Sequence, residues 1–92
     1  MEHLEEEEYR SLQSALILRP EQGSVIPGSG GLRKLRWGVK GRGKRGGLRV
    51  IYYWEKESEK FYMLFVFPKN EQEDLTPVQL RVLGRLVREE FK

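Results

Sequence analysis

The chain has 92 residues, with 17 Lys or Arg, 14 Asp or Glu, one His and no Cys, and a net charge of +3 at pH 7. This length permits one domain with a modest core, because such a chain buries only roughly 60–68% of the surface that it exposes when unfolded. The lack of cysteine excludes a disulfide framework, a zinc ribbon and a thiol nucleophile. The longest apolar run, residues 61–67, is far shorter than the about 20 residues that a membrane-spanning helix needs, and no signal peptide opens the chain, so we expect a cytoplasmic protein without a membrane partner.

Residues 4–18 have the apolar spacing of a helix. Tyr9, Leu12 and Leu16 recur at intervals of three and four, and the pattern ends before Pro20. The acidic run at the start of this helix is favoured by the helix dipole, and we interpret it as a solvated helix terminus. Residues 21–31 contain four glycines and one proline, which predicts a loop with turns.

Three stretches of the sequence predict strands. Residues 32–37 alternate as in a half-exposed strand, with Leu32, Lys34 and Arg36 on one face and Arg33, Leu35 and Trp37 on the other. Residues 49–54 and 61–67 are rich in aromatic and β-branched side chains and predict a hairpin around the charged segment 55–60. The last strand is apolar on both faces, so we expect it to be central in the sheet. Its alternation assigns one face to Phe61, Met63, Phe65 and Phe67.

The segment 75–87 predicts a C-terminal helix with a well-specified start. Thr76 is a suitable N-cap, Pro77 suits the first helical position, and Gln79 completes a capping box. Leu75 is placed to pack against Leu80. The apolar stripe that should cover one face of the sheet consists of Leu80, Leu83, Leu86 and Val87.

Positive charge is concentrated in the centre of the sequence. Between Gln22 and Trp54 there are eight Lys or Arg and no Asp or Glu. The segment 38–47 alternates five glycines with the cations Lys40, Arg42, Lys44 and Arg45. Glycine lets a backbone approach a phosphodiester closely, and the cations supply charge-assisted hydrogen bonds, so the pattern favours binding to a polyanion over a merely flexible hairpin tip. The same basic run continues on the flanking strands in Arg33, Lys34, Arg36 and Arg49.

Two nucleotide-binding motifs occur in this segment and are rejected on context. Gly38-x4-Gly43-Lys44 resembles a P-loop, but Arg45 follows where Ser or Thr should hold magnesium, and a strand follows in place of a helix. The spacing Gly41-x-Gly43-x-x-Gly46 lacks the same helix, whose N-terminus would receive the pyrophosphate of a dinucleotide.

Catalytic motifs of the common kinds are absent from the sequence. His3 is the single histidine and lies at the chain end, so neither a Ser-His-Asp arrangement nor a paired-histidine ribonuclease is possible. Glu71, Glu73 and Asp74 without His or Cys would be a weak metal site, and solvated acids are the better interpretation. We expect no metal and no cofactor, so that any chemistry would use Lys and Arg.

The ordered series GGLRKLRW, KGRGKRGG, LRVIYYW, FPKNE and DLTPVQL resembles the HigB-type branch of the RelE/ParE superfamily, the toxins of bacterial type II toxin–antitoxin systems. The resemblance runs from about Tyr9 to Val87. It implies an α+β fold in which a twisted antiparallel sheet of about three strands carries an N-terminal and a C-terminal helix on one face. It also implies a metal-independent endoribonuclease that cuts ribosome-bound mRNA, and a cognate helix-turn-helix antitoxin of the HigA type. We expect residues 1–92 to form a single domain that lacks the N-terminal strand and helix of the family.

The resemblance also implies roles for individual residues. Arg49 would clamp the transition state, because Arg stays charged and can hold a phosphate through two hydrogen bonds. Lys44 would act as base or electrostatic support with a pKa lowered by its cationic neighbours, and Lys69 is the third catalytic candidate. The expected RNA-binding residues are Arg33, Lys34, Arg36, Lys40, Arg42 and Arg45.

Two other functions remain open at the level of sequence. The same basic sheet could occupy ribosomal or other RNA without cutting it. Alternatively, the chain could be a ParE-like toxin that acts on gyrase, which would share the fold without ribonuclease chemistry.

Overall fold

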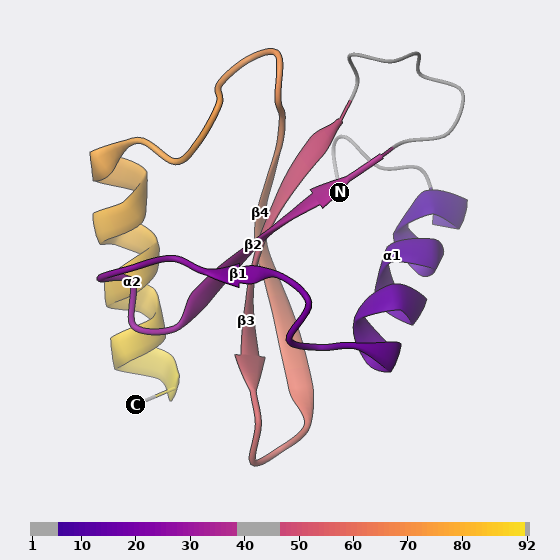
Figure 1. Cartoon of the computed structure of the whole chain (residues 1–92). Helices are drawn as coiled ribbons and strands as arrows, with labels where there is room; N and C mark the ends of the chain where they lie inside the picture. The colour runs from indigo at the N-terminus through magenta and orange to yellow at the C-terminus, as the bar shows by residue number, and fades with distance from the viewer. Residues whose placement is uncertain (1–5, 39–46, 92) are drawn as a thin grey trace.

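The computed structural model describes residues 6–38 and 47–91. Its elements, in chain order, are α1 (Glu6–Leu18), β1 (Ser24–Val25), β2 (Leu32–Trp37), β3 (Leu48–Glu55), β4 (Lys60–Pro68) and α2 (Pro77–Phe91). The strands form a twisted antiparallel sheet in the order β1-β2-β3-β4 (Figure 1). The predicted α+β class, both helices and the three predicted strands are confirmed, and the sheet has one strand more than expected.

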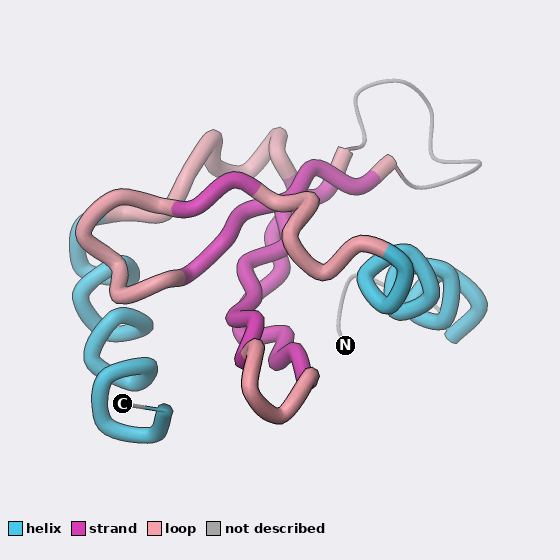
Figure 2. Tube along the Cα trace, turned by 60° about the horizontal axis from the view of Figure 1, so that its bottom comes forward, coloured by secondary structure: helices cyan, strands magenta, loops and turns pink. Residues whose placement is uncertain are grey.

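The two helices cover opposite faces of the sheet (Figure 1, Figure 2). The buried core on the α1 side consists of Leu12, Leu16, Leu48, Val50 and Tyr52. The buried core on the α2 side consists of Ile26, Leu32, Ile51, Tyr53, Phe67 and Val87. The expectation of helices on one face is therefore wrong. Strand β3 places apolar side chains on both faces in alternation, so that each face needs its own cover.

The short strand β1, which the sequence did not predict, is held in place by the Tyr52 side chain. The buried Tyr52 hydroxyl donates to the Pro20 carbonyl oxygen at 2.7 Å and accepts the Gly23 N–H at 2.9 Å. A Cβ atom on Gly23 would lie 2.8 Å from the Tyr52 ring, so this close approach requires glycine. Burial raises the pKa of Tyr52. A two-residue strand fixed by a side chain 29 residues away has no local pattern that could predict it.

Strand β4 lies at the edge of the sheet, whereas its apolar pattern predicted a central position. The central strand is β3, which pairs with both β2 and β4. A register shift in the β3–β4 pair leaves Leu64 without a partner, so Leu64 and Phe65 both pack on the α2 side, between Met63 and Val66 on the α1 side. The predicted strict alternation over residues 61–67 is therefore wrong, because one extra residue in a bulge reverses the faces of all residues that follow.

The start of α2 confirms the predicted capping box. The Thr76 hydroxyl accepts the Gln79 N–H at 3.1 Å, and the Gln79 side chain accepts the Thr76 N–H at 2.9 Å. Leu75 and Leu80 both pack against the α2-side core. Gly84 is buried, and a Cβ atom there would lie 3.4 Å from the Ser29 carbonyl oxygen. A small residue at this position thus allows α2 to approach the loop that follows β1.

None of the helices in the described residues is both long and apolar enough to cross a membrane.

Removal of the Tyr52 hydroxyl should destabilise the fold specifically. Tyr52→Phe leaves the Pro20 carbonyl and the Gly23 N–H without their partner, and unsatisfied buried groups of this kind cost about 1–3 kcal/mol. We expect the free energy of unfolding, measured by urea denaturation at pH 7, to fall by this amount. Tyr53→Phe is the matched control, because the Tyr53 hydroxyl makes no hydrogen bond among the described residues. Equal losses in the two variants would contradict the role given to Tyr52.

Candidate nucleic-acid interface

Three predicted cations lie together on the α2 face of the sheet. Lys34 is opposite Ile51 in the β2–β3 register, and Arg36 is opposite Arg49. Ile51 belongs to the α2-side core, and alternation along a strand puts every second residue on the same face. Lys34, Arg36 and Arg49 therefore share this face. Arg36 is exposed and the other two are half-buried.

The pair formed by Arg36 and Arg49 is unfavourable in the isolated chain. Like charges directly opposite each other on neighbouring strands destabilise a sheet. The Arg49 Nε atom is also buried and has no hydrogen-bond partner, and a buried polar group in this state costs about 1–3 kcal/mol, or more when it is charged. A bound anion would relieve both penalties at once, because its negative charge would offset the two positive charges and it would accept a hydrogen bond from the Arg49 Nε–H group.

Asp74 is the acidic residue that the structure adds to this site. Its carboxylate accepts a hydrogen bond from Lys34 Nζ at 2.6 Å and a second from the Leu75 N–H at 2.9 Å. The hydrogen bond from Lys34 is the main cause that lowers the pKa of Asp74, and the charge of Arg49 contributes further. Asp74 therefore stays ionised and partly neutralises the basic face. Sequence reasoning assigned it to a solvated loop, since no local signal links residues 40 positions apart.

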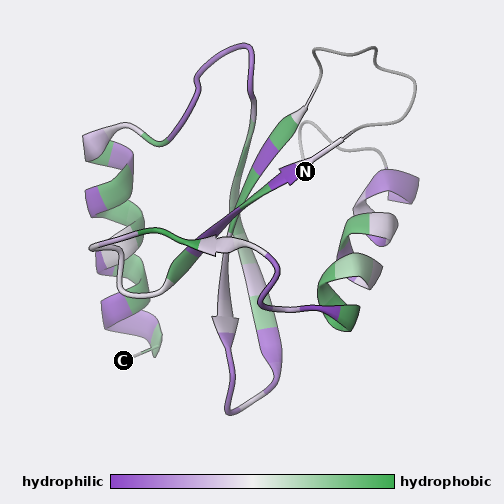
Figure 3. Cartoon of the chain, in the orientation of Figure 1, coloured by the Kyte–Doolittle hydropathy of each residue, from purple (hydrophilic) through white to green (hydrophobic). Residues whose placement is uncertain are grey.

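Lys69 lies at the end of the sheet where β2 finishes and β3 begins. Its backbone N–H donates to the Gly47 carbonyl oxygen at 3.0 Å, which extends the β3–β4 ladder beyond β4. Gly47 is two residues before Arg49, so the half-buried Lys69 is anchored beside the start of the strand that carries Arg49. The hydrophilic segment that follows it, up to the start of α2, lies at this end (Figure 3).

Arg33 lies on the opposite face of the sheet from Lys34, Arg36 and Arg49. It lies on the α1 side with Tyr52, its partner in the register. Its guanidinium donates to the carbonyl oxygens of Glu21 and Gly23 at 3.1 and 2.8 Å, and it lies 3.9 Å from the Glu21 carboxylate. These contacts hold the segment before β1. The remaining predicted site residues lie outside the described part of the chain: Lys40, Arg42, Lys44 and Arg45.

Within residues 6–38 and 47–91, no group of three or more His, Cys, Asp or Glu side chains could hold a metal ion. The donors that the described site offers are guanidinium and ammonium groups. These bind phosphate oxygens through charge-assisted hydrogen bonds, and Arg can do so through two at once.

The order helix, four antiparallel strands, helix, with the sheet between the two helices, defines a small α+β protein of the RelE-like fold. The sequence model of the family described as the RelE toxin of the RelE/RelB toxin–antitoxin system matches residues 5–91, so the chain belongs to this family. It is thus a toxin of a toxin–antitoxin system. RelE toxins are generally endoribonucleases, pair with an antitoxin and act on the ribosome.

The link between Lys34 and Asp74 predicts an acid-sensitive contribution to stability. A carboxyl group whose pKa is lowered by folding stabilises the protein above its unfolded pKa, about 3.9, and this stabilisation is lost as the pH falls through the lower folded value. Because the pair is partly exposed, Asp74→Asn should lower the free energy of unfolding at pH 7 by no more than about 1 kcal/mol.

The measurement is urea denaturation of the original protein and Asp74→Asn at a series of pH values from 7 downward. The difference in the free energy of unfolding should decrease progressively as the pH falls below about 3.9. Glu73→Gln is the control, because Glu73 is exposed and makes no ion pair in the described part of the chain. A difference that does not change with pH would assign another role to Asp74.

Proposed function

We propose that this toxin is a ribosome-dependent mRNA endoribonuclease of the HigB type, which blocks translation without a metal ion. The observation that carries the proposal is the direct opposition of Arg36 and Arg49 on β2 and β3, with the Arg49 Nε atom buried and unpaired. A protein retains such an unfavourable arrangement where a ligand stabilises it, and a phosphodiester supplies the required charge and acceptors. Because the chain belongs to the RelE family, we propose that RNA supplies this phosphodiester.

The proposed reaction is an internal transfer at the scissile phosphate. The ribose 2′-oxygen forms a bond to phosphorus while the bond from phosphorus to the 5′-oxygen breaks, which leaves a 2′,3′-cyclic phosphate and a 5′-hydroxyl. One group must accept the 2′-hydroxyl proton, another must deliver a proton to the leaving oxygen, and cations must stabilise the additional charge on the phosphorane-like transition state.

Arg49 has the best position for the transition-state clamp. It is the half-buried arginine of the α2-side cations, its Nε atom has no hydrogen-bond partner, and a guanidinium can hold a phosphate through two hydrogen bonds. The backbone N–H of Lys69 is hydrogen-bonded to the Gly47 carbonyl oxygen, two residues before Arg49. From this position at the end of β4, the Lys69 ammonium group would contact the phosphate. Lys44 remains the proposed base or electrostatic support in the segment between β2 and β3.

The RNA-binding surface that we propose consists of Lys34, Arg36, Lys40, Arg42 and Arg45. Arg33 was also expected to bind RNA, but its hydrogen bonds to the carbonyl oxygens of Glu21 and Gly23 indicate that it mainly stabilises the fold. An incoming phosphate would compete with Asp74 for Lys34, so that the acid keeps the face partly neutral until RNA arrives.

The activity is tested in a purified translation reaction on a defined mRNA, with new 5′ ends mapped by primer extension. Loss of one transition-state contact typically lowers the rate about 10²–10³-fold, and we expect a decrease of this size for Arg49→Ala. Arg49→Lys should recover only part of it, because Lys cannot form the paired hydrogen bonds of a guanidinium. Arg85→Ala is the matched control, since it removes the same charge from an exposed position on α2.

Each pattern of cleavage has one interpretation. New ends that require active ribosomes and disappear with Arg49→Ala would support the proposal. Uncut mRNA with translation still blocked would indicate a non-catalytic ribosome-binding module. Uncut mRNA with normal translation, accompanied by DNA damage in cells, would indicate a gyrase-directed toxin.

RNA binding should depend steeply on salt. If four to six cations contact phosphates of single-stranded RNA, log K should fall against log salt concentration with a slope of roughly −3 to −4. The combined Arg36→Ala and Arg49→Ala variant should reduce this slope by about 1.4, because each lost phosphate contact on a single strand contributes about 0.7. The slope is obtained from fluorescence anisotropy of a labelled oligonucleotide at several salt concentrations. Binding that is insensitive to salt would contradict a phosphate-contacting surface.

The cognate partner that we propose is a helix-turn-helix antitoxin of the HigA type in a bacterial cytoplasm. Family membership supports an antitoxin partner. Co-expression of the protein with the product of a neighbouring helix-turn-helix gene should yield a complex that does not cleave mRNA.

A further inference from the structure

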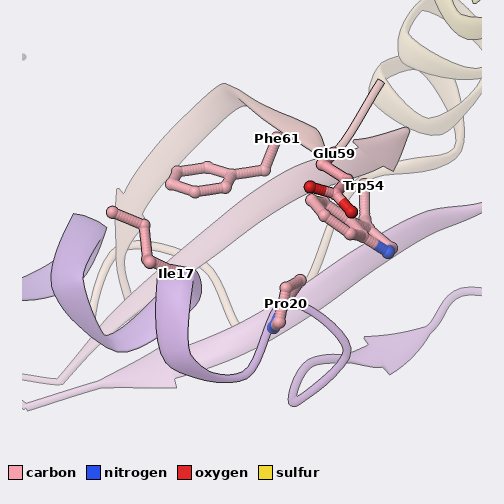
Figure 4. Close-up of a pocket in the computed structure, with 5 residues that line it drawn as sticks. All are labelled: Ile17, Pro20, Trp54, Glu59 and Phe61. Carbon is pink, nitrogen blue, oxygen red and sulfur yellow. The ribbon is translucent and has the colours of Figure 1, made fainter. Parts of the chain in front are cut away.

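A pocket lies on the α1 side, near the β-turn that joins β3 and β4. Its volume is about 340 Å³, and its walls are Ile17, Pro20, Trp54, Glu59 and Phe61 (Figure 4). Trp54 and Phe61 are direct partners in the β3–β4 register, so the paired strands hold the two aromatic rings next to each other. The volume is at the lower end of the about 300–1,000 Å³ that small-molecule sites occupy, which suits one side chain.

Glu59 supplies a carboxylate to this apolar pocket. It occupies the left-handed backbone region, with φ of 57°, in the turn before β4. Glu59 and Trp54 both line the pocket (Figure 4). The side chain is exposed and makes no ion pair or hydrogen bond in the described part of the chain. Carboxylate and aromatic ring together attract a cation, through charge and through the negative face of the indole.

The end of α1 adds apolar surface next to the pocket. The helix ends at Leu18, where Ile17 and Leu18 are 68% and 81% exposed, and Ile17 lines the pocket. The exposed Arg19 follows the helix directly, and the Gln22 side chain donates to the Ala15 and Arg19 carbonyl oxygens, so the preference for a cation depends on Glu59 and Trp54.

We propose that this pocket binds an arginine side chain of a partner protein, with apolar residues next to that arginine covering Ile17 and Leu18. A guanidinium is planar, so it can stack on Trp54 while its N–H groups reach the Glu59 carboxylate. RNA is a less suitable occupant, because the Glu59 carboxylate in the pocket repels phosphates. The pocket lies on the sheet face opposite Arg36 and Arg49, so its occupant leaves the proposed RNA surface accessible.

The test uses the full chain labelled with ¹⁵N and the peptide acetyl-Ala-Leu-Arg-Leu-Ala-amide. The chain has two tryptophans, and their indole N–H signals are assigned with Trp54→Phe. We expect the peptide to shift the Trp54 signal in a saturable way at up to millimolar concentration, while the Trp37 signal stays in place as an internal control. The same peptide with citrulline, which keeps the shape of arginine without its charge, should bind about 10-fold more weakly.

The role of Glu59 is tested with a matched pair of variants. Glu59→Gln should weaken peptide binding about 5–10-fold, which corresponds to roughly 1–1.4 kcal/mol at a partly exposed site. Glu57→Gln removes the same charge from the same turn without lining the pocket and should leave binding unchanged. The indole N–H signals of Trp37 and Trp54 must remain well separated in both variants, which shows that the variants are folded.

Several outcomes would overturn the proposal. These are equal binding of the arginine and citrulline peptides, equal effects of Glu59→Gln and Glu57→Gln, or no shift of Trp54 at millimolar peptide. A shift of Trp54 by oligouridylate would assign the pocket to RNA, and a shift on raising the protein concentration alone would assign it to a second copy of this chain. These results are independent of mRNA cleavage, so failure of one proposal does not decide the other.

Discussion

The structure depends on one strand, β3, being buried on both of its faces. Its side chains alternate between the α1-side core and the α2-side core, and it is hydrogen-bonded to β2 and β4 along its length. Each helix is held to the sheet by the residues that β3 presents to it. Through the Tyr52 hydroxyl, the same strand also fixes the segment before β1. Arg49 is therefore placed on the central strand of the sheet, which is paired on both sides, so that a phosphate could be held there with little reorganisation.

Charge is distributed along the sheet so that its two ends favour opposite ligands. At the end where β2 finishes, Arg36 and Arg49 face each other, and Asp74 offsets part of the positive charge, mainly that of Lys34. At the turn between β3 and β4, Glu59 and the two aromatic rings form a surface that favours cations. Under the two proposals above, an anionic nucleic acid and a cationic protein segment would bind to different faces of the sheet.

The sequence predicted the elements whose signals are local. The capping box of Thr76 and Gln79 lies within four residues, and the hairpin of β3 and β4 follows from two apolar runs around a charged turn. The bulge at Leu64 could not be predicted, because it reflects the packing of two strands against each other. Five of the nine predicted site residues lie in the described part of the chain: Arg33, Lys34, Arg36, Arg49 and Lys69. The sequence alone separated neither Arg33 from the other four nor Asp74 from the solvated acids.

The sequence by itself determined the element types, the basic character of the centre and the family resemblance, because periodicity, capping and composition act over a few neighbouring residues. Only the tertiary structure decided which face each cation occupies and which partner it has. Asp74 meets Lys34 across 40 residues, and Tyr52 meets Pro20 across 32. Contacts of this kind depend on strand register and on the helix that covers each face, which are set by the packing of the whole chain.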